Sequence, residues 1–283
     1  MRKLVSVYMP TKNRLTLATR AIESVLKQTY KNMELIVVDD GSELIQFQKL
    51  KDNFKDHKNV IFLRNEESLG ACKSRNRAIK HARGEFITGL DDDDYFSDKN
   101  RITYFVNTWT QIGHKSSGLF DSLSTLQPDG KHLKVKFIPV VSKNDLKYKN
   151  HIGSQVFAPT QAFVEADFFD PKMPAWQDWD MWFRITQPHK PFVNINKNTY
   201  MLDRAHGGRR ISEKPEEILR LAKKRLTKKM GRLNLRQKAG ITASFLAYKQ
   251  VNLSFKEIIW TLLAFRPKQT IRAIYRKLVP IIK

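Results

Sequence analysis

The sequence predicts an α/β fold with a mostly parallel central sheet flanked by helices, followed by a basic helical extension. Apolar runs of strand length alternate with helical segments through about the first hundred residues, and polar clusters follow several of these runs. Lysine and arginine concentrate after Ser212, where 18 of the 51 basic residues but only 4 of the 28 acidic residues are found. A chain of 283 residues suits one α/β domain with an appendage.

The first predicted elements alternate regularly. Strands are expected at residues 4–9, 35–38, 60–63 and 86–90, and helices at residues 15–26, 43–54 and 70–82. Strands separated by helices of about a dozen residues favour right-handed βαβ units, which build a parallel sheet.

The later elements are less regular. Residues 114–176 carry a mixed pattern, in which a strand at 133–141 is the favoured element. A helix is expected over residues 178–185, where Trp179, Trp182 and Phe183 supply bulk. Beyond Ser212 the chain is expected to be helical and basic.

Composition limits the class of protein. Cys72 is the only cysteine, so an intrachain disulfide or cysteine zinc site is excluded and a reducing compartment is favoured. The apolar run after Lys3 is too short for a signal-peptide core, and no stretch approaches the ~18 apolar residues of a membrane-spanning helix. We therefore expect a cytoplasmic protein. The net charge of +23 is concentrated in the basic tail. The tail is then a solvated helical surface, a patch that binds nucleic acid, or a surface attracted to the inner face of an anionic membrane.

Polar clusters follow three of the predicted strands. They are Pro10-Thr11-Lys12-Asn13-Arg14, Asp39-Asp40-Gly41-Ser42 and Asp91-Asp92-Asp93-Asp94. Because ligands bind at the carboxyl ends of the strands in open α/β sheets, the three clusters are expected to face one crevice.

The run of four aspartates is the strongest local signal. Adjacent carboxylates at a buried strand end repel one another, and a hard cation such as Mg²⁺ or Mn²⁺ would stabilise them and bridge to substrate phosphates. A solvated acidic turn is the alternative. The Asp39 cluster is either a simple Asp-Gly turn or a carboxylate that accepts a hydrogen bond from a nucleobase N–H.

A third pattern combines acids with large aromatic residues, in Gln177-Asp178-Trp179-Asp180 and the residues that follow. Burial against aromatic rings raises the pKa of a carboxyl group and suits it to act as a general base. An acid at a helix N-terminus is also expected from the helix dipole alone.

Taken in order, these pieces resemble glycosyltransferase family 2 with its GT-A fold. The matching segments are residues 5–14, residues 34–42, residues 70–82 with Arg75 and Asn76, residues 84–87 leading into Asp91 and Asp93, and residues 177–180. The likeness covers roughly residues 3–210.

The resemblance implies a role for each matching residue. A UDP-sugar donor would be bound by Pro10, Thr11, Asn13, Arg14, Asp39, Asp40, Arg75, Asp91, Asp92, Arg209 and Arg210. A divalent metal, Mn²⁺ or Mg²⁺, would be held by Asp93, Asp91 and His206, with an ordinary surface histidine as the alternative reading of His206. Asp178 would be the base, and Trp179 and Asp180 would contact the acceptor. The chain departs from the family pattern at Lys12, where an aromatic residue is common, and at Gln177, where glutamate is usual.

The activity implied is an inverting transfer of a sugar to an acceptor hydroxyl by metal-assisted single displacement, with a surface-polysaccharide or lipid-linked saccharide as acceptor. Residues 1–212 would form the catalytic domain, with a nucleotide-binding half at about 1–95 and an acceptor-binding half at about 96–212, and residues 213–283 the extension. Two other classes remain in view. A sugar-nucleotide nucleotidyltransferase would have a glycine-rich loop after the first strand, which residues 10–14 lack. A nucleic-acid-binding protein would explain the charge, but four aspartates would repel phosphate.

The tail carries two apolar stripes at helical spacing. They consist of Phe255, Ile258, Ile259, Leu262 and Leu263, and of Ile271, Ile274, Tyr275, Leu278, Val279 and Ile282. The stripes either pack on the catalytic domain or on a second subunit of a homo-oligomer, or they lie in a membrane interface beside the basic residues.

Overall fold

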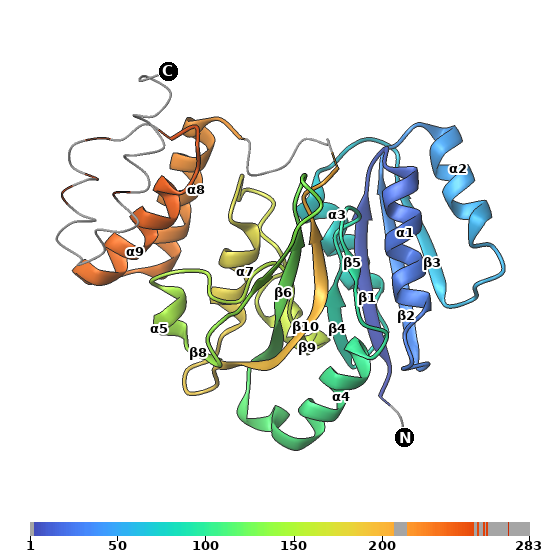
Figure 1. The fold of residues 1–283 in the computed structure, drawn as a ribbon, viewed down its shortest axis with the longest axis horizontal. Coiled ribbons are helices and arrows are strands. Elements are labelled where there is room, and N and C mark those ends of the chain that lie inside the picture. Colours follow the sequence, from blue (N-terminus) through green and yellow to red (C-terminus); the bar gives the residue numbers. More distant parts are fainter. Residues whose placement is uncertain are drawn as a thin grey trace.

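The computed structural model describes residues 3–206 and 214–251 and the single positions Ser254, Glu257, Ile259 and Ile271. A ten-stranded sheet runs through the middle of the described chain, with helices on both of its faces (Figure 1). The strand order is β3-β2-β1-β4-β9-β6-β10-β5, with β7 paired to β6 and β8 paired to β10. Parallel ladders account for most of the paired residues, as the sequence predicts.

The first half confirms the predicted alternation to within a few residues. Its strands are β1 (Val5–Thr11), β2 (Met33–Asp40), β3 (Val60–Asn65) and β4 (Phe86–Gly89), all joined in parallel. The connecting helices are α1 (Leu15–Leu26), α2 (Leu44–Asn53) and α3 (Ala71–His81). The carboxyl ends of β1, β2 and β4 therefore meet at one edge of the sheet.

The second half contains strands that the sequence pattern does not predict. After β5 (Tyr95–Phe96), α4 (Arg101–Ile112) and the short η1 (Gly113–Lys115), the strands β6 (Gly118–Leu126) and β10 (Phe192–Asp203) pair in parallel. β9 (Phe157–Pro159) lies antiparallel between β4 and β6 and joins the two halves into one sheet.

The strand predicted at 133–141 is divided in two. β7 (His132–Val135) pairs with β6, whereas β8 (Val140–Val141) pairs with β10. Pro139 lies between them and cannot donate a backbone hydrogen bond, although its carbonyl accepts one from Asn194. The short helices α5 (Lys143–Leu146) and α6 (Thr160–Glu165) complete this region.

Side chains of β1 alternate between two hydrophobic cores. Val5, Val7 and Met9 pack into the core beneath α1 and α4, whereas Tyr8 packs into the core shared with α3, α6 and α7 (Gln177–Ile185). This alternation is expected of a strand covered on both faces. The site at the strand ends therefore rests on a rigid support.

The extension is helical and basic where it is described, as predicted. α8 (Glu216–Met230) and α9 (Leu235–Leu246) lie beside α7, on the side away from the sheet (Figure 1). A third core cluster joins them to Ala175, just before α7. Of the two predicted apolar stripes, only Ile259 and Ile271 are among the described residues. Within the described chain, no helix is long and apolar enough to cross a membrane.

Candidate active site

The three polar strand ends meet, as the sequence predicts. At the end of β1, which includes Pro10, the Thr11 hydroxyl donates to Asp92 at 2.8 Å. Arg14 Nη1 donates to Asp92 at 2.9 Å and to Asp93 at 3.0 Å. The backbone N–H of Asn13 donates to the Ser42 hydroxyl at 2.8 Å, which brings in the β2 end. Residues 11–14 therefore connect the other two clusters.

The carboxylates of the acidic run after β4 are crowded together and repel one another. Burial raises the pKa of Asp92 to about 6; the neighbouring Arg14 opposes this shift and the charge of Asp93 adds to it. Burial and the negative charges of Asp91 and Asp93 raise the pKa of Asp94 well above its ordinary value. Added positive charge at this turn would relieve the repulsion.

Asp39 and Asp40 occupy different environments at the end of β2. Asp39 is 1% exposed and accepts hydrogen bonds from Arg64 at 2.6 Å and from the Ser42 N–H at 3.1 Å. Asp40 instead faces the loop before α3. Its oxygens accept from the side chains of Asn65, Ser68 and Ser74 and from the N–H groups of Leu69 and Gly70.

These donors change the titration of Asp40. Burial alone would raise its pKa, but the hydrogen bonds outweigh burial and lower the pKa below its ordinary value. The charged carboxylate thus fixes the start of α3. The nearby Gly41 has φ +72°, and a Cβ there would lie 2.8 Å from the backbone of Glu67 and Ser68, so the turn requires glycine.

Arg75 links the acidic run to α7. Its guanidinium is almost fully buried and contacts Asp91 at 2.7 Å and Asp178 at 3.5 Å. The helix α3 supplies Arg75, the β4 end supplies Asp91, and the first turn of α7 supplies Asp178. Two predicted site carboxylates from separate elements therefore converge on the Arg75 cation, itself a predicted site residue.

The environment of Asp178 suits a general base. Desolvation raises the pKa of Asp178 to about 7; Arg75 opposes this shift and the charge of Asp91 adds to it. The side chain nevertheless keeps 30% of its surface exposed, so a ligand can reach it. A carboxylate with a pKa near neutrality can accept a proton and release it again at physiological pH.

Asp93 and His206 lie together beside the acidic run. Nε2 of His206 is 3.2 Å from Oδ2 of Asp93. Within the described chain, no three His, Cys, Asp or Glu side chains form a metal-binding group. Carboxylate oxygens and an imidazole nitrogen suit Mn²⁺, and such ions commonly take only one or two carboxylates plus substrate phosphates. The donor set therefore fits a divalent cation shared with a diphosphate. Arg209 and Arg210 lie outside the described residues.

The two residues predicted to contact the acceptor are buried. Trp179 is 3% exposed, and its indole N–H donates to the Leu146 carbonyl at 2.7 Å. Asp180 is 0% exposed and pairs with Arg184 at 2.9 Å and Lys229 at 2.7 Å. Residues two apart on a helix point in nearly opposite directions, so Asp180 faces the extension when Asp178 faces the site.

Three residues that the prediction omits hold the acidic turn. The Tyr200 hydroxyl donates to Asp94 at 2.8 Å, and the Asp203 N–H donates to the same carboxylate at 3.0 Å. Arg20 binds Asp203 at 2.5 Å and the Asp93 carbonyl at 2.6 Å. Asp94 is part of the acidic run in the sequence, but both of its partners belong to the unpredicted β10, and Arg20 belongs to α1.

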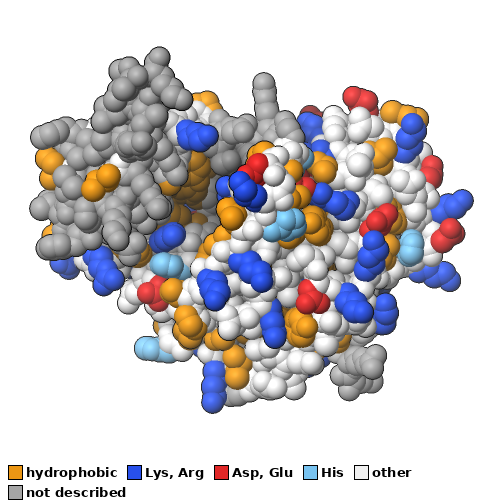
Figure 2. All heavy atoms as spheres, in the orientation of Figure 1, with side chains coloured by type: hydrophobic (Ala, Val, Ile, Leu, Met, Phe, Trp, Pro, Cys, Tyr) orange, Lys and Arg blue, Asp and Glu red, His pale blue; other side chains and the backbone are white. Residues whose placement is uncertain are grey.

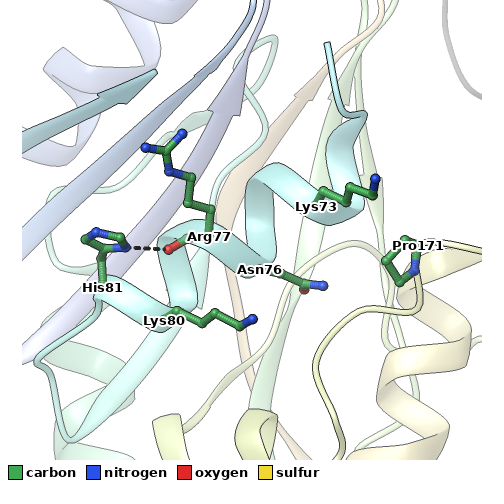
Figure 3. A pocket seen from close by; sticks show the side chains of 6 residues that line it. All are labelled: Lys73, Asn76, Arg77, Lys80, His81 and Pro171. Carbon is green, nitrogen blue, oxygen red and sulfur yellow. Dashed lines mark hydrogen bonds between the residues drawn. The ribbon is translucent and has the colours of Figure 1, made fainter. Parts of the chain in front are cut away.

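A separate basic pocket of about 340 Å³ lies on the outer side of α3. Figure 3 shows its lining: Lys73, Asn76, Arg77, Lys80, His81 and Pro171. It contains none of the predicted site residues. Arg77 within it donates to the Arg64 carbonyl and to Asn65, so this side chain also supports the end of β3.

Comparison with known proteins identifies the family. The model for Glycosyl transferase family 2 matches residues 6–120. The glycosyl transferase WcaA of Escherichia coli K12, named for colanic acid biosynthesis, is 34% identical over 219 residues, covering 76% of this chain and 77% of WcaA. The Escherichia coli protein WfgD, named UDP-Glc:alpha-D-GlcNAc-diphosphoundecaprenol beta-1,3-glucosyltransferase, is 46% identical over 125 residues, covering 40% of this chain and 48% of WfgD.

Solved structures show the same fold. TarS of S. aureus in complex with UDP-GlcNAc matches with a TM-score of 0.63 at 18% identity, over 96% of this chain and 89% of that chain. Mannosyltransferase PcManGT of Pyrobaculum calidifontis in complex with GDP-Man and Mn²⁺ matches with a TM-score of 0.62 at 14% identity, over 98% and 88% of the two chains. The fold is therefore GT-A.

This chain belongs to glycosyltransferase family 2 and is a glycosyltransferase. The recognised family and the predicted fold class are confirmed. The nucleotidyltransferase and nucleic-acid-binding alternatives are set aside.

Proposed function

We propose that the enzyme transfers a sugar from a UDP-sugar to a hydroxyl of a lipid-linked saccharide, with inversion at the anomeric carbon. The observation that carries the proposal is the link from Asp178 through Arg75 to Asp91, which joins a base of near-neutral pKa to a carboxylate of the strand-end cluster. WfgD is named for a UDP-Glc donor and TarS is known in complex with UDP-GlcNAc, which supports UDP as the nucleotide.

The donor would lie across the carboxyl ends of β1, β2 and β4. Pro10, Thr11 and the buried Asp39 would hold the uridine, as the family resemblance implies. The diphosphate would lie near Asn13, Arg14 and Arg75. Arg209 and Arg210 would also contact it. Asp40 would act by holding the loop before α3, since its oxygens already accept five internal hydrogen bonds.

A divalent cation held by Asp93, Asp91 and His206 would neutralise charge that develops on the departing diphosphate. The solved complex of PcManGT with GDP-Man and Mn²⁺ supports this choice of ion. Asp92 would orient the turn through its contacts with Thr11 and Arg14.

Asp178 would take the proton of the acceptor hydroxyl. The acceptor oxygen then forms a bond to the anomeric carbon, the bond from that carbon to the diphosphate oxygen breaks, and UDP leaves with the electron pair. A single displacement of this kind inverts the anomeric centre. Arg75 would keep the Asp178 carboxylate in position for the attack.

The acceptor and the location of the enzyme are part of the proposal. WfgD is named for an acceptor with a diphosphoundecaprenol anchor, and WcaA for the synthesis of a polysaccharide. A lipid-linked acceptor would be reached at the inner face of the cell membrane, where the basic extension would meet anionic lipid. We propose a cytoplasmic enzyme that docks on this surface.

The test measures UDP binding and UDP release separately. With Mn²⁺ and UDP-glucose, the wild-type enzyme should release UDP slowly without acceptor, and chelation of the metal should stop the release. Asp93→Ala should weaken metal-dependent UDP binding about tenfold or more. Asp178→Asn should keep UDP binding and lower transfer by about 100-fold to 10,000-fold.

Asp56→Asn is the matched control, because this exposed aspartate lies between α2 and the amino end of β3, at the sheet edge opposite the strand ends that form the site. It should behave as wild type in both measurements. Unchanged UDP affinity in Asp93→Ala would remove that residue from the metal site. Undiminished transfer by Asp178→Asn would remove the base.

A further inference from the structure

The residue that begins α7 has an unusual backbone conformation. Trp176 is the N-cap of the helix and has φ 58° and ψ 31°, in the left-handed region. Bulky aromatic residues rarely adopt this conformation, and they persist in it only where their surroundings fix them. Asp178, the proposed base, follows two residues later.

Several of the contacts that hold Trp176 and the segment before it come from the extension. Its indole N–H donates to the Tyr248 hydroxyl at 2.8 Å, across 72 residues of sequence. Lys214 donates to the Pro174 carbonyl at 2.6 Å, and Gln250 donates to the Lys214 carbonyl at 2.7 Å. The segment before α7 is thus held by the residues that flank α8 and α9.

Both rings lie at the edge of the core. Trp176 and Tyr248 are each half-buried and pack against the cluster formed by α8 and α9, while Trp176 also packs against the main core. Their ring centroids are 6.4 Å apart at 38°. The hydrogen bond pairs the indole N–H of Trp176 with a lone pair of the Tyr248 hydroxyl, and both half-buried rings lie beside the start of the base helix.

Tyr248 also lies within electrostatic reach of the base. Burial raises the pKa of its hydroxyl; the hydrogen bond from Trp176 opposes this, and the negative charge of Asp178 adds to it. Trp176 precedes Asp178 by two residues and is hydrogen-bonded to Tyr248, so an acceptor whose hydroxyl reaches Asp178 would pass close to these rings.

We propose that Trp176 and Tyr248 form a subsite for the acceptor sugar, so that the C-terminal extension completes the acceptor-binding site. This inference rests on the proposed function. Aromatic rings with one polar handle suit the apolar C–H faces of a pyranose ring, as sites for small polar ligands combine aromatic walls with a few polar groups. The subsite takes the place of the predicted contacts from Trp179 and Asp180, which are buried.

The test uses full-length enzyme, UDP-glucose, Mn²⁺ and a water-soluble GlcNAc α-diphosphate carrying a short alkyl tail. Tyr248→Ala and Trp176→Phe should each raise the acceptor KM about fivefold to tenfold. The KM for UDP-glucose and acceptor-free UDP release should stay within about twofold of wild type, since neither ring belongs to the donor half. Tyr248→Phe, which keeps the ring, should fall between wild type and Tyr248→Ala.

Two control variants on α4 match the chemistry of these changes. Trp109→Phe and Tyr104→Ala alter half-buried aromatic side chains of a helix on the other face of the sheet. They should leave the acceptor KM unchanged.

Each outcome decides the inference. An unchanged acceptor KM in both Tyr248→Ala and Trp176→Phe, with a wild-type enzyme that transfers, overturns the subsite and leaves the proposed function standing. A parallel fall in acceptor-free UDP release also overturns it, because the rings would then only support the fold. If the wild-type enzyme binds UDP-glucose but never uses the acceptor, the proposed acceptor class fails and the subsite fails with it.

Discussion

Opposing effects act on the pKa of Asp178. Desolvation raises its pKa to about 7, Arg75 at 3.5 Å opposes the shift, and Asp91 reinforces it. The base must be ionised to accept a proton, so kcat/KM should rise with pH through about 7 in the free enzyme. A profile of transfer between about pH 5.5 and about pH 9 measures this limb.

Replacing Arg75 tests whether the ionisation of Asp178 causes the rise of kcat/KM with pH. Arg75→Gln removes the positive charge that lowers the pKa of Asp178, so the rising limb should move to higher pH. The control Asp56→Asn should leave the rising limb at the wild-type pH. A limb in Arg75→Gln that stays at the wild-type pH, or moves to lower pH, would contradict the assignment of Asp178 as the titrating base.

The same pKa makes a prediction for stability. The folded-state pKa of Asp178 lies above its ordinary value, so its contribution to stability is present at low pH and lost as pH rises through about 7. Asp178→Asn cannot ionise and should therefore raise the free energy of unfolding at pH 8 by about 1–3 kcal/mol. Near pH 4 the difference should almost vanish. Urea titrations at the two pH values measure it, and equal effects at both would be inconsistent with a raised pKa.

Sequence alone predicts part of this site. The strand-end clusters follow directly from the pattern, because parallel strands bring their carboxyl ends together. The pattern around α7 does not distinguish Asp178 from Asp180, because the two side chains have the same chemistry. The distinction depends on what covers each side of the helix, and one partner of the buried Asp180 is Lys229, almost fifty residues further along the chain.

Lys229 joins the extension to the base helix. Its ammonium group pairs with the fully buried Asp180 and with Asp170, each at 2.7 Å. Lys229→Met should destabilise the protein by about 3 kcal/mol, because it leaves a buried carboxylate with Arg184 as its remaining cation.

Lys228→Met is the control, since Lys228 is exposed and neighbours Lys229 on α8. It should change stability by less than about 0.5 kcal/mol. Denaturant unfolding of the two variants measures the difference. Equal stability would mean that the contact between α7 and α8 contributes nothing.

Local sequence likewise predicts some secondary-structure elements and not others. β1 to β4 and the helices between them are short apolar runs and amphipathic segments in alternation, so local sequence defines them. β6 is buried along nearly its whole length, yet it contains Asp121, which pairs with the buried Arg101 at 2.8 Å. β10 pairs with β6 through two register shifts and contains several polar residues. Such strands are stabilised by distant partners, which a local pattern does not contain.

At the scale of the whole molecule, the positive charge is spread over the surface as well as concentrated in the extension. Figure 2 shows lysine and arginine side chains across the visible face of the described residues. Removing the extension would not isolate its role in membrane docking, because α8 and α9 also hold the start of α7. The charge must therefore be changed while the helices are kept.

Neutralising exposed cations of the extension provides such a test. The fourfold variant Lys224→Gln, Lys228→Gln, Arg232→Gln and Lys249→Gln changes only exposed positions. Basic residues near an anionic leaflet contribute about 1 kcal/mol each, so binding to vesicles with one quarter phosphatidylserine should fall by at least about tenfold. Raising the salt concentration should weaken wild-type binding in the same direction.

The comparison that decides the question is a second fourfold variant with the same change in net charge. Lys49→Gln, Lys51→Gln, Lys55→Gln and Lys58→Gln neutralise exposed lysines in and after α2, at the opposite end of the molecule from α8 and α9 (Figure 1). If the extension is the docking surface, this variant should keep most of its vesicle binding, because charges beyond a Debye length of about 10 Å from the lipid contribute little. An equal loss in both variants would indicate attraction by net charge alone, and no loss in either would exclude electrostatic docking through these residues.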